Sequence, residues 1–372
     1  MQSSKTSPRF IISGGGTGGH IYPAIALADE IKMRLPKSEV LFVGAKGKME
    51  MEKVPKAGYQ IKGLWISGLD RGNLSSNLNF PLKLAKSLWE ATGIIKEFKP
   101  DAAIGTGGFA SGPVLWAAAQ KKLPVLIQEQ NSLPGITNKL LKNKAFAICT
   151  AYPDMDKYFD SEKLHLTGNP IRSEIFLNLP DAKTAKSNFQ LNPEKPVILN
   201  IGGSLGAKSL NDAWIYGLES ILAEDVQIIW QTGKLQYDNI KANPVTHHPN
   251  VHVTEFIYNM KDAFAAADVI VSRAGAMAIS ELTLVGKPCI LVPFPFAAED
   301  HQTVNAQQLA MRNAAIMIKD SQAGDELVKE TLSLLKNEEL SKQLSSNIQA
   351  MAKPDATSHI VDVLFQKLNL EV

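Results

Sequence analysis

Residues 10–20 read FIISGGGTGGH, and this stretch decides the fold class. An apolar run of strand type, 10–12, leads directly into a glycine-rich turn, and a helix-like stretch follows at 24–35. A strand, a glycine turn and a helix in this order are the first element of an open parallel sheet. The spacing G-x-G-x-x-G lets backbone N–H groups approach a phosphate at the helix N-terminus. A tight turn that binds no ligand is the alternative interpretation.

The same order recurs along the chain. Further strand-like runs are 40–43, 102–104, 125–127, 197–201, 227–231, 269–271 and 289–292. Near-continuous apolar strands that alternate with helices predict parallel sheets covered on both faces. We therefore predict two Rossmann-like domains of the α/β class, at residues 1–168 and 169–354, with a final helix at 355–372 packing back on the first. Because ligands bind at the carboxyl ends of parallel strands, we expect the glycine loops to face each other across a cleft.

Composition excludes several classes of protein. The 372 residues carry 39 basic and 37 acidic side chains, a net charge of +2, which argues against a dedicated nucleic-acid binder. Cys149 and Cys289 are too far apart in sequence for a Cys-x-x-Cys motif, and we expect both to be buried thiols. The uncharged segment 102–120 is interrupted by four glycines and Pro113, so we expect membrane contact to be peripheral only.

A second glycine loop, GGSLG at 202–206, offers backbone N–H groups and the Ser204 hydroxyl to a phosphate. It lacks the Gly-Lys-Ser/Thr of nucleoside triphosphatases. A dinucleotide dehydrogenase would need an acid at the end of the second strand, where Gly44 and Ala45 stand. A nucleotide-sugar fits two glycine loops in separate domains, because its diphosphate and its sugar can each meet one of them.

Several polar residues follow these strands. Glu281 could accept both ribose hydroxyls, or be a solvated helix acid. His20 could take a proton from an attacking hydroxyl, or bond to backbone at the start of a helix. Asp154 and Asp156 have the Asp-x-Asp spacing of metal-dependent glycosyltransferases, but acids that begin a following helix are the better interpretation, so no metal is expected. Arg172 could then stabilise a leaving diphosphate.

These motifs together resemble the MurG family, the N-acetylglucosaminyltransferases that convert lipid I to lipid II in peptidoglycan synthesis. The likeness covers nearly the whole chain in order, in the segments GGGTGGH 14–20, TGGFASG 106–112, EQN 129–131, GNPIR 168–172, GGSLG 202–206, TEFI 254–257, RAGA 273–276 with Glu281, and DHQ 300–302 with Asn305.

The resemblance implies a GT-B fold and an inverting transfer without metal or cofactor. N-acetylglucosamine would pass from UDP-N-acetylglucosamine to the 4-hydroxyl of the lipid I acceptor, undecaprenyl-pyrophosphoryl-N-acetylmuramyl-pentapeptide, for cell wall biogenesis, cell shape and cell division. The enzyme would lie at the cytoplasmic face of the plasma (inner) membrane, on an anionic surface, with other cell-wall synthesis proteins as partners and no nucleic acid.

The resemblance also implies roles for individual residues. Ile257 would contact uracil through its backbone, Glu281 would hold ribose, and Ser204 and Arg172 would lie near the diphosphate. The donor sugar would be surrounded by Thr17, Gly18, Gly19, Asn131, Ala276, Met277 and Gln302. The other substrate-binding candidates are Ala278, Ile279, Ser280 and Asn305.

The first glycine loop would also receive the acceptor pyrophosphate. The family often has His where this chain has Gln128. The candidates for the catalytic base are therefore His20 and Glu129.

Residues 79–99 predict a helix, with Pro81 in its first turn. Leu84, Leu88, Ala91, Ile95 and Phe98 recur at helical spacing and predict a core stripe. The apolar residues left over lie beside lysines, which suits shallow insertion into an anionic leaflet, although a second buried edge is the alternative. These membrane-contact candidates are Leu78, Phe80, Leu82 and Trp89.

Two other functions remain open from the sequence. A UDP-N-acetylglucosamine 2-epimerase-like enzyme would share the two domains but needs no lipid acceptor. A non-catalytic nucleotide-sugar-binding subunit would tend to lack one half of the chain.

Overall fold

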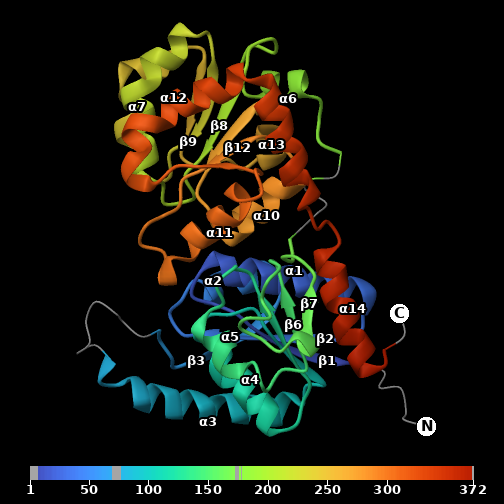
Figure 1. Ribbon diagram of the computed structural model, residues 1–372. Coiled ribbons are helices and arrows are strands. Elements are labelled where there is room, and N and C mark those ends of the chain that lie inside the picture. The colour runs from blue at the N-terminus through green and yellow to red at the C-terminus, as the bar shows by residue number, and fades with distance from the viewer. Residues whose placement is uncertain (1–6, 69–76, 172–175, 177, 371–372) are drawn as a thin grey trace. The chain divides into compact units, whose positions relative to one another are not determined.

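The computed structural model describes residues 7–68, 77–171, 176 and 178–370. The chain divides into two compact units (Figure 1): unit 1 comprises residues 1–172 and 353–372, and unit 2 comprises residues 173–352. Each unit is built on a parallel β-sheet with helices packed on both faces. The predicted α/β class with two Rossmann-like domains is confirmed.

The sheet of unit 1 has seven parallel strands in the order β3-β2-β1-β4-β5-β6-β7. Strands β1, β2, β4 and β5 lie where the apolar runs predict them, whereas β3, β6 and β7 were not predicted. β3 and β7 are mostly half-buried edge strands, so they lack a strong apolar pattern. The bounds are β1 (Arg9–Ser13), β2 (Glu39–Ala45), β3 (Gln60–Leu64), β4 (Ala102–Gly105), β5 (Val125–Glu129), β6 (Ala147–Thr150) and β7 (Leu164–Leu166).

Two helical layers cover this sheet. Phe10 and Ile12 of β1 belong to the core on one face of the sheet, which α1 and α14, the first and last helices, cover. Ile11 belongs to the core on the opposite face of the sheet. The last helix packs on the first, and Arg34 forms an ion pair with Asp362 at 2.7 Å. The helices are α1 (Gly18–Arg34), α2 (Glu50–Lys56), α3 (Phe80–Phe98), α4 (Ser111–Gln120), α5 (Ile136–Leu141), the 3₁₀ turn η2 (Ser161–Lys163) and α14 (Ala356–Leu368).

The sheet of unit 2 has six parallel strands in the order β10-β9-β8-β11-β12-β13. β8 and β9 begin and end where the sequence predicts, while β10 and the two-residue β13 were not predicted. The bounds are β8 (Val197–Ile201), β9 (Gln227–Gln231), β10 (Val251–Thr254), β11 (Val269–Ser272), β12 (Cys289–Leu291) and β13 (Ile316–Met317).

Trp214 and Trp230 are fully buried in the core of unit 2, which α7 and α12 cover on one face (Figure 1). The helices of this unit are α6 (Ala182–Asn188), α7 (Lys208–Ala223), α8 (Tyr237–Lys241), α9 (Met260–Ala266), α10 (Ala276–Val285), α11 (His301–Ala310), α12 (Ala323–Lys336) and α13 (Glu338–Ala350). The 3₁₀ turns are η4 (Pro244–His247), η5 (Ala298–Asp300) and η6 (Asp320–Gln322).

Strand order places a topological switch point in each sheet. In unit 1 the chain moves from β1 to β2 on one side, and β4 lies on the other side of β1. In unit 2, β8 has β9 on one side and β11 on the other. Loops that follow the strands at a switch point diverge and leave room for a ligand. Both glycine loops found in the sequence follow such strands, β1 and β8.

Two local predictions are wrong. No α-helix follows Asp156: residues 156–158 form turns, and Asp154 has a left-handed backbone with φ of 61°. On α3, Leu84 is 36% exposed and does not belong to the core stripe, whereas the predicted Ala91 and Ile95 are buried, together with Ser87, which was not predicted. The prediction of a helix at this place, with Pro81 in its first turn, is confirmed.

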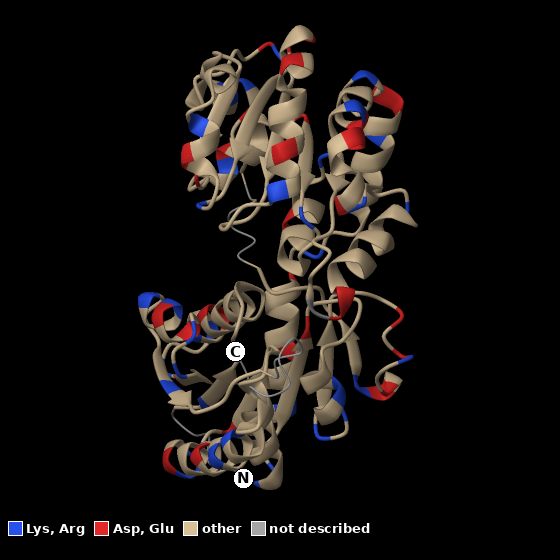
Figure 2. Cartoon of the chain, turned by 90° about the vertical axis from the view of Figure 1, so that its left-hand side faces the viewer, with Lys and Arg blue, Asp and Glu red and all other residues tan. Residues whose placement is uncertain are grey.

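The remaining global features agree with the composition. Cys149 and Cys289 are buried thiols, and burial raises the pKa of each to about 12. Basic and acidic residues are interspersed along both units (Figure 2). Within the described ranges, no helix has the length and apolar character that crossing a bilayer requires.

Candidate functional site

The first glycine loop, residues 14–17, packs directly on the loop that follows β4. Gly108 has φ of +82°, and a Cβ on it would lie only 2.2 Å from the backbone oxygen of Gly15. Part of the glycine pattern is therefore explained by the close approach of two loops. Both loops lie at the switch point of the sheet, since Ser13 and Gly105 are register partners on β1 and β4.

A buried carboxylate lies beneath this loop. Glu50, at the start of α2, has no exposed surface, and its oxygens accept hydrogen bonds from Gly16 N at 3.1 Å and Ala45 N at 2.9 Å. Glu50 thus ties the end of β2 to the glycine loop. Sequence reasoning missed this residue, because nothing near Glu50 in the sequence points to a contact 34 positions away.

The start of α1 offers donors to an anion. Thr17 is the N-cap in extended conformation, and the N–H groups of Gly18 and Gly19 have no helical carbonyl one turn before them. Apart from the backbone of its own helix, the one described atom within 4 Å of a Cβ on Gly19 would be the Thr17 hydroxyl oxygen, at 3.7 Å, so the space beside Gly19 is open. With the positive end of the helix dipole, these groups suit a phosphate or a sugar oxygen.

His20 lies between the loops of β1, β4 and β5. Its Nδ1 is 2.9 Å from Thr106 O and 3.0 Å from Gln130 Oε1, and its own carbonyl accepts from the Thr106 hydroxyl at 2.7 Å. The ring thus bonds to backbone at the start of a helix, as one of the two interpretations predicts, and the role of His20 as a base stays a prediction.

Glu129, the other candidate base, ends β5 and is 1% exposed. One oxygen accepts from Asn131 N at 3.0 Å and more weakly from Asn131 Nδ2 at 3.4 Å. The other accepts from Gly135 N at 3.0 Å and Asn138 Nδ2 at 2.8 Å. The carboxylate therefore shapes the segment that carries Asn131, and it is surrounded by donors.

In unit 2, the loop of residues 202–206 packs on the turn after β9. Gly206 has φ of +88°, and a Cβ there would lie 2.2 Å from Thr232 O. Lys234 N donates to Ser204 O at 3.2 Å, while the Ser204 side chain is exposed. α7 begins shortly afterwards at Lys208. The loop presents an exposed hydroxyl and turn N–H groups beside a helix N-terminus.

Ile257 lies after β10 and is 3% exposed. Its N–H donates to Oε1 of the buried Gln231, at the end of β9, at 3.0 Å. The Thr254 hydroxyl donates to Phe256 O at 3.1 Å. The backbone around Ile257 is thus held by a side chain from the neighbouring strand, which the sequence pattern does not reveal.

Six candidates lie on the first turns of α10: Ala276, Met277, Ala278, Ile279, Ser280 and Glu281. Ala276 and Ile279 are buried, and the Ser280 hydroxyl donates to Ala276 O at 3.0 Å. Burial raises the pKa of the half-buried Glu281 carboxyl from 4.5 to about 7. Within the described residues no hydrogen bond or ion pair to this carboxylate is found.

The last candidates stand on α11. Gln302 Oε1 accepts from Phe294 N at 2.9 Å, and the fully buried Asn305 donates to Ala274 O at 3.4 Å. Arg273, which sequence reasoning left without a role, forms an ion pair with Asp320 and donates to Val292 O at 3.0 Å. These contacts hold the loops after β11 and β12 together. Arg172 lies outside the described residues.

The membrane candidates do not share one environment. Leu78, Leu82 and Trp89 are 80%, 65% and 76% exposed, but Phe80 is half-buried. Lys83 and Lys86 lie over the ring of Trp65, at 5.9 and 5.1 Å from its centroid. The exposed apolar residues are thus accompanied by basic ones on the same segment.

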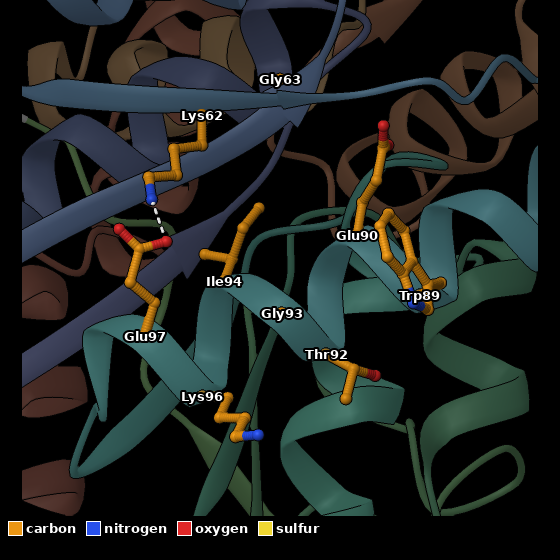
Figure 3. A pocket seen from close by; sticks show the side chains of 9 residues that line it. All are labelled: Lys62, Gly63, Trp89, Glu90, Thr92, Gly93, Ile94, Lys96 and Glu97. Carbon is orange, nitrogen blue, oxygen red and sulfur yellow. Dashed lines mark hydrogen bonds and ion pairs between the residues drawn. The ribbon is translucent and has the colours of Figure 1, made fainter.

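A shallow pocket of about 590 Å³ lies between β3 and α3 (Figure 3). Trp89 and Glu90 line one part of it, and Lys62 forms an ion pair with Glu97 at 2.8 Å in another. Among the residues that the structure describes, no group of three or more His, Cys, Asp or Glu side chains could hold a metal ion.

Comparisons with known proteins identify the family. The glycosyltransferase family 28 N-terminal domain matches residues 10–150, and the C-terminal domain of the same family matches residues 197–360. A relative from Cytophaga hutchinsonii is 51% identical over 363 residues, which cover 98% of both chains. The chain belongs to glycosyltransferase family 28.

Two relatives carry the same name. The relatives from Cytophaga hutchinsonii and Flavobacterium psychrophilum are both named UDP-N-acetylglucosamine–N-acetylmuramyl-(pentapeptide) pyrophosphoryl-undecaprenol N-acetylglucosamine transferase. The Flavobacterium psychrophilum relative is 49% identical over 96% of this chain and 97% of its own. A solved structure of Acinetobacter baumannii MurG is similar, with a TM-score of 0.78 and 31% identity, covering 97% of this chain and 99% of that one.

A solved structure of the UDP-N-acetylglucosamine 2-epimerase from Neisseria meningitidis shares the fold alone. It has 15% identity and a TM-score of 0.67, and it covers 97% of this chain and 100% of that one. The epimerase alternative therefore gains no support for this family 28 chain.

Proposed function

We propose that this chain transfers N-acetylglucosamine from UDP-N-acetylglucosamine to the 4-hydroxyl of undecaprenyl-pyrophosphoryl-N-acetylmuramyl-pentapeptide, with inversion at the anomeric carbon. The observation that carries the proposal is the 51% identity, over 98% of both chains, to a relative that bears the name of this transferase. Both family 28 domains match in the expected order.

In this proposal, unit 2 binds the donor. The backbone of Ile257 would contact uracil, Glu281 would accept the ribose hydroxyls, and the exposed Ser204 hydroxyl would meet the diphosphate. The start of α10, with Met277 and Ala278, adds N–H groups and a helix dipole that stabilise the negative charge developing on UDP as it leaves. Arg172, Gln302 and Asn305 stay candidates for the diphosphate and the sugar.

Unit 1 would bind the acceptor, with its pyrophosphate near the N–H groups of Gly18 and Gly19. We assign the base to His20. The Glu129 carboxylate is 1% exposed and already accepts hydrogen bonds from two backbone N–H groups and two side-chain amides. His20 would take the proton of the 4-hydroxyl while that oxygen bonds to the anomeric carbon and the bond to the diphosphate breaks.

The exposed face of α3 would lie on an anionic membrane surface. Leu82 and Trp89 stand seven positions apart, so they point to the same side of the helix. Their apolar surface, flanked by Lys83, Lys86 and Lys96, suits shallow insertion. We place the enzyme at the cytoplasmic face of the plasma membrane, where it would meet a membrane-bound acceptor.

Incubation with labelled UDP-N-acetylglucosamine and a short-chain lipid I analogue tests the function. We expect a labelled disaccharide lipid and one UDP released for each sugar transferred. Omission of the acceptor is the control for hydrolysis. Release of UDP that does not depend on the acceptor, or conversion of the sugar to a 2-epimer, would refute the proposal.

A further inference from the structure

Three buried amide side chains form a closed hydrogen-bond network at the strand ends of unit 1. Gln130, Gln128 and Asn169 are 1%, 0% and 3% exposed. Gln130 Nε2 donates to Gln128 Oε1, Gln128 Nε2 donates to Asn169 Oδ1 at 2.9 Å, and Asn169 Nδ2 donates to Gln130 O at 3.2 Å. Each of the three amide nitrogens thus donates to an oxygen of the network, and such pairing favours the burial of amide side chains.

The surroundings of Gln130 fix which end of its amide is oxygen. Its Nε2 faces Thr106 O at 2.7 Å, Gln128 O at 3.2 Å and Gln128 Oε1. All three are oxygens, so this end must be the NH₂ group. Exchanging the two ends would place an oxygen against three oxygens. The carbonyl end therefore points at His20 Nδ1, 3.0 Å away.

The tautomer of His20 follows from these positions. Among the described residues, Gln130 Oε1 and Thr106 O, the latter at 2.9 Å, face Nδ1, and both can only accept hydrogen bonds. Nδ1 must therefore carry a hydrogen. In the neutral ring the lone pair then resides on Nε2. The ring also lies close to the backbone, because a Cβ on Gly107 would be 2.8 Å from Nδ1.

We infer that Gln130 is a positioning residue that, together with Thr106 O, holds His20 in the Nδ1–H tautomer, with the lone pair on Nε2 as the proton acceptor for the transfer. This inference rests on the proposed function only for the role of Nε2 in catalysis. Gln128 and Asn169 act one step further away, since they hold the amide of Gln130 in its orientation.

The tautomer can be measured without any turnover. Nitrogen-15 NMR of the histidine rings of the full chain at pH 8 separates a protonated ring nitrogen from one that carries a lone pair, and His20→Asn assigns the His20 signals. We expect Nδ1 to be protonated and Nε2 to carry the lone pair. In Gln130→Met, which keeps the shape but removes the amide, Nδ1 retains Thr106 O as an acceptor but loses Gln130 Oε1, so a fraction of the Nε2–H form should appear beside the Nδ1–H form. Gln227→Met is the matched control, because Gln227 is a buried glutamine of unit 2, 0% exposed, that bonds to Asn192.

Kinetics test the catalytic consequence separately. Gln130→Met should lower kcat about tenfold and leave KM for the donor unchanged, and Gln128→Met should have a smaller effect, because Thr106 O still holds Gln130 in that variant. Gln227→Met should change neither constant. Nε2–H as the main form in the wild type, or an unchanged tautomer in Gln130→Met, would overturn the inference. Absence of transfer in the wild type with the expected tautomer would refute the proposed function alone.

Discussion

Replacing Glu281 by Gln should stabilise unit 2 at high pH while weakening donor binding. Burial raises the pKa of this carboxyl from 4.5 to about 7. A difference of this size disfavours the charged form in the folded state by about 3 kcal/mol, an upper value because the side chain is only half-buried. Gln has nearly the same shape and no charge, so it removes this cost.

The sign follows from proton binding. A folded-state pKa above the unfolded value means that the folded chain holds a proton between pH 4.5 and about 7 that the unfolded chain has released. Stability is therefore lost as pH rises through this window. The advantage of Glu281→Gln should be near zero at pH 4.5 and reach about 2–3 kcal/mol at pH 8.

Urea unfolding at pH 5 and pH 8 measures this difference. Trp214 and Trp230 are fully buried and both belong to unit 2, whereas Trp65, Trp89 and Trp116 of unit 1 are all exposed by 39% or more. The blue-shifted emission therefore reports mainly on unit 2. Glu219→Gln, at an exposed position of α7, is the matched control and should change little at either pH.

Donor binding supplies the second measurement. If the charged carboxylate accepts the ribose hydroxyls, UDP affinity of the wild type should rise about tenfold between pH 6 and pH 8. Glu281→Gln should bind UDP more weakly and lose this pH dependence. A variant that is no more stable than the wild type at pH 8 would refute the burial argument, and unchanged UDP affinity would refute the ribose role.

Three further predictions concern unit 1. His20→Asn keeps a hydrogen-bond donor towards Gln130 but removes Nε2. Its kcat should therefore fall about 10²–10⁴-fold, with the thermal midpoint of unfolding unchanged. Near-normal turnover would exclude His20 as the base. Gly108→Ala should lower the free energy of unfolding by at least about 2 kcal/mol, because φ is +82° and the new Cβ would lie 2.2 Å from a backbone oxygen. Gly93→Ala on α3 is its control, because a Cβ there would meet no atom within 4 Å outside the backbone of its own helix. An equal effect of the two changes on the urea midpoint would contradict the argument. Trp89→Ser should weaken binding to anionic liposomes about tenfold in a flotation assay, while UDP affinity stays constant. Tyr216→Ser, at an 89% exposed position on unit 2, is the control. A loss of liposome binding in Trp89→Ser no greater than that in Tyr216→Ser would count against the α3 surface.

Most strands whose burial makes their sequence continuous and apolar could be predicted, although the fully buried β6 was missed. β8 is buried over most of its length and was located from its residues alone. β3, β7 and β13 are short or only half-buried edge strands, and each is stabilised by pairing with one neighbouring strand. Their own residues carry too little hydrophobic pattern to distinguish a strand from a loop.

The glycine loops, the helix starts and the candidate residues on them could be found by motif, because these features depend on residues close together in sequence. The contacts that give them their chemistry could not. Gln130 and His20 are 110 positions apart, and Gln231 and Ile257 are 26 apart. No local pattern states which strands will be neighbours.

The order of residues by itself settled the alternation of strand and helix, since backbone preference and hydrophobic period act over a few residues. Tertiary structure alone decided that Glu50 would hold the first glycine loop, that Glu129 would be enclosed by donors, and that an amide would face Nδ1 of His20. These outcomes require strand order and register, which arise only when distant segments pack together.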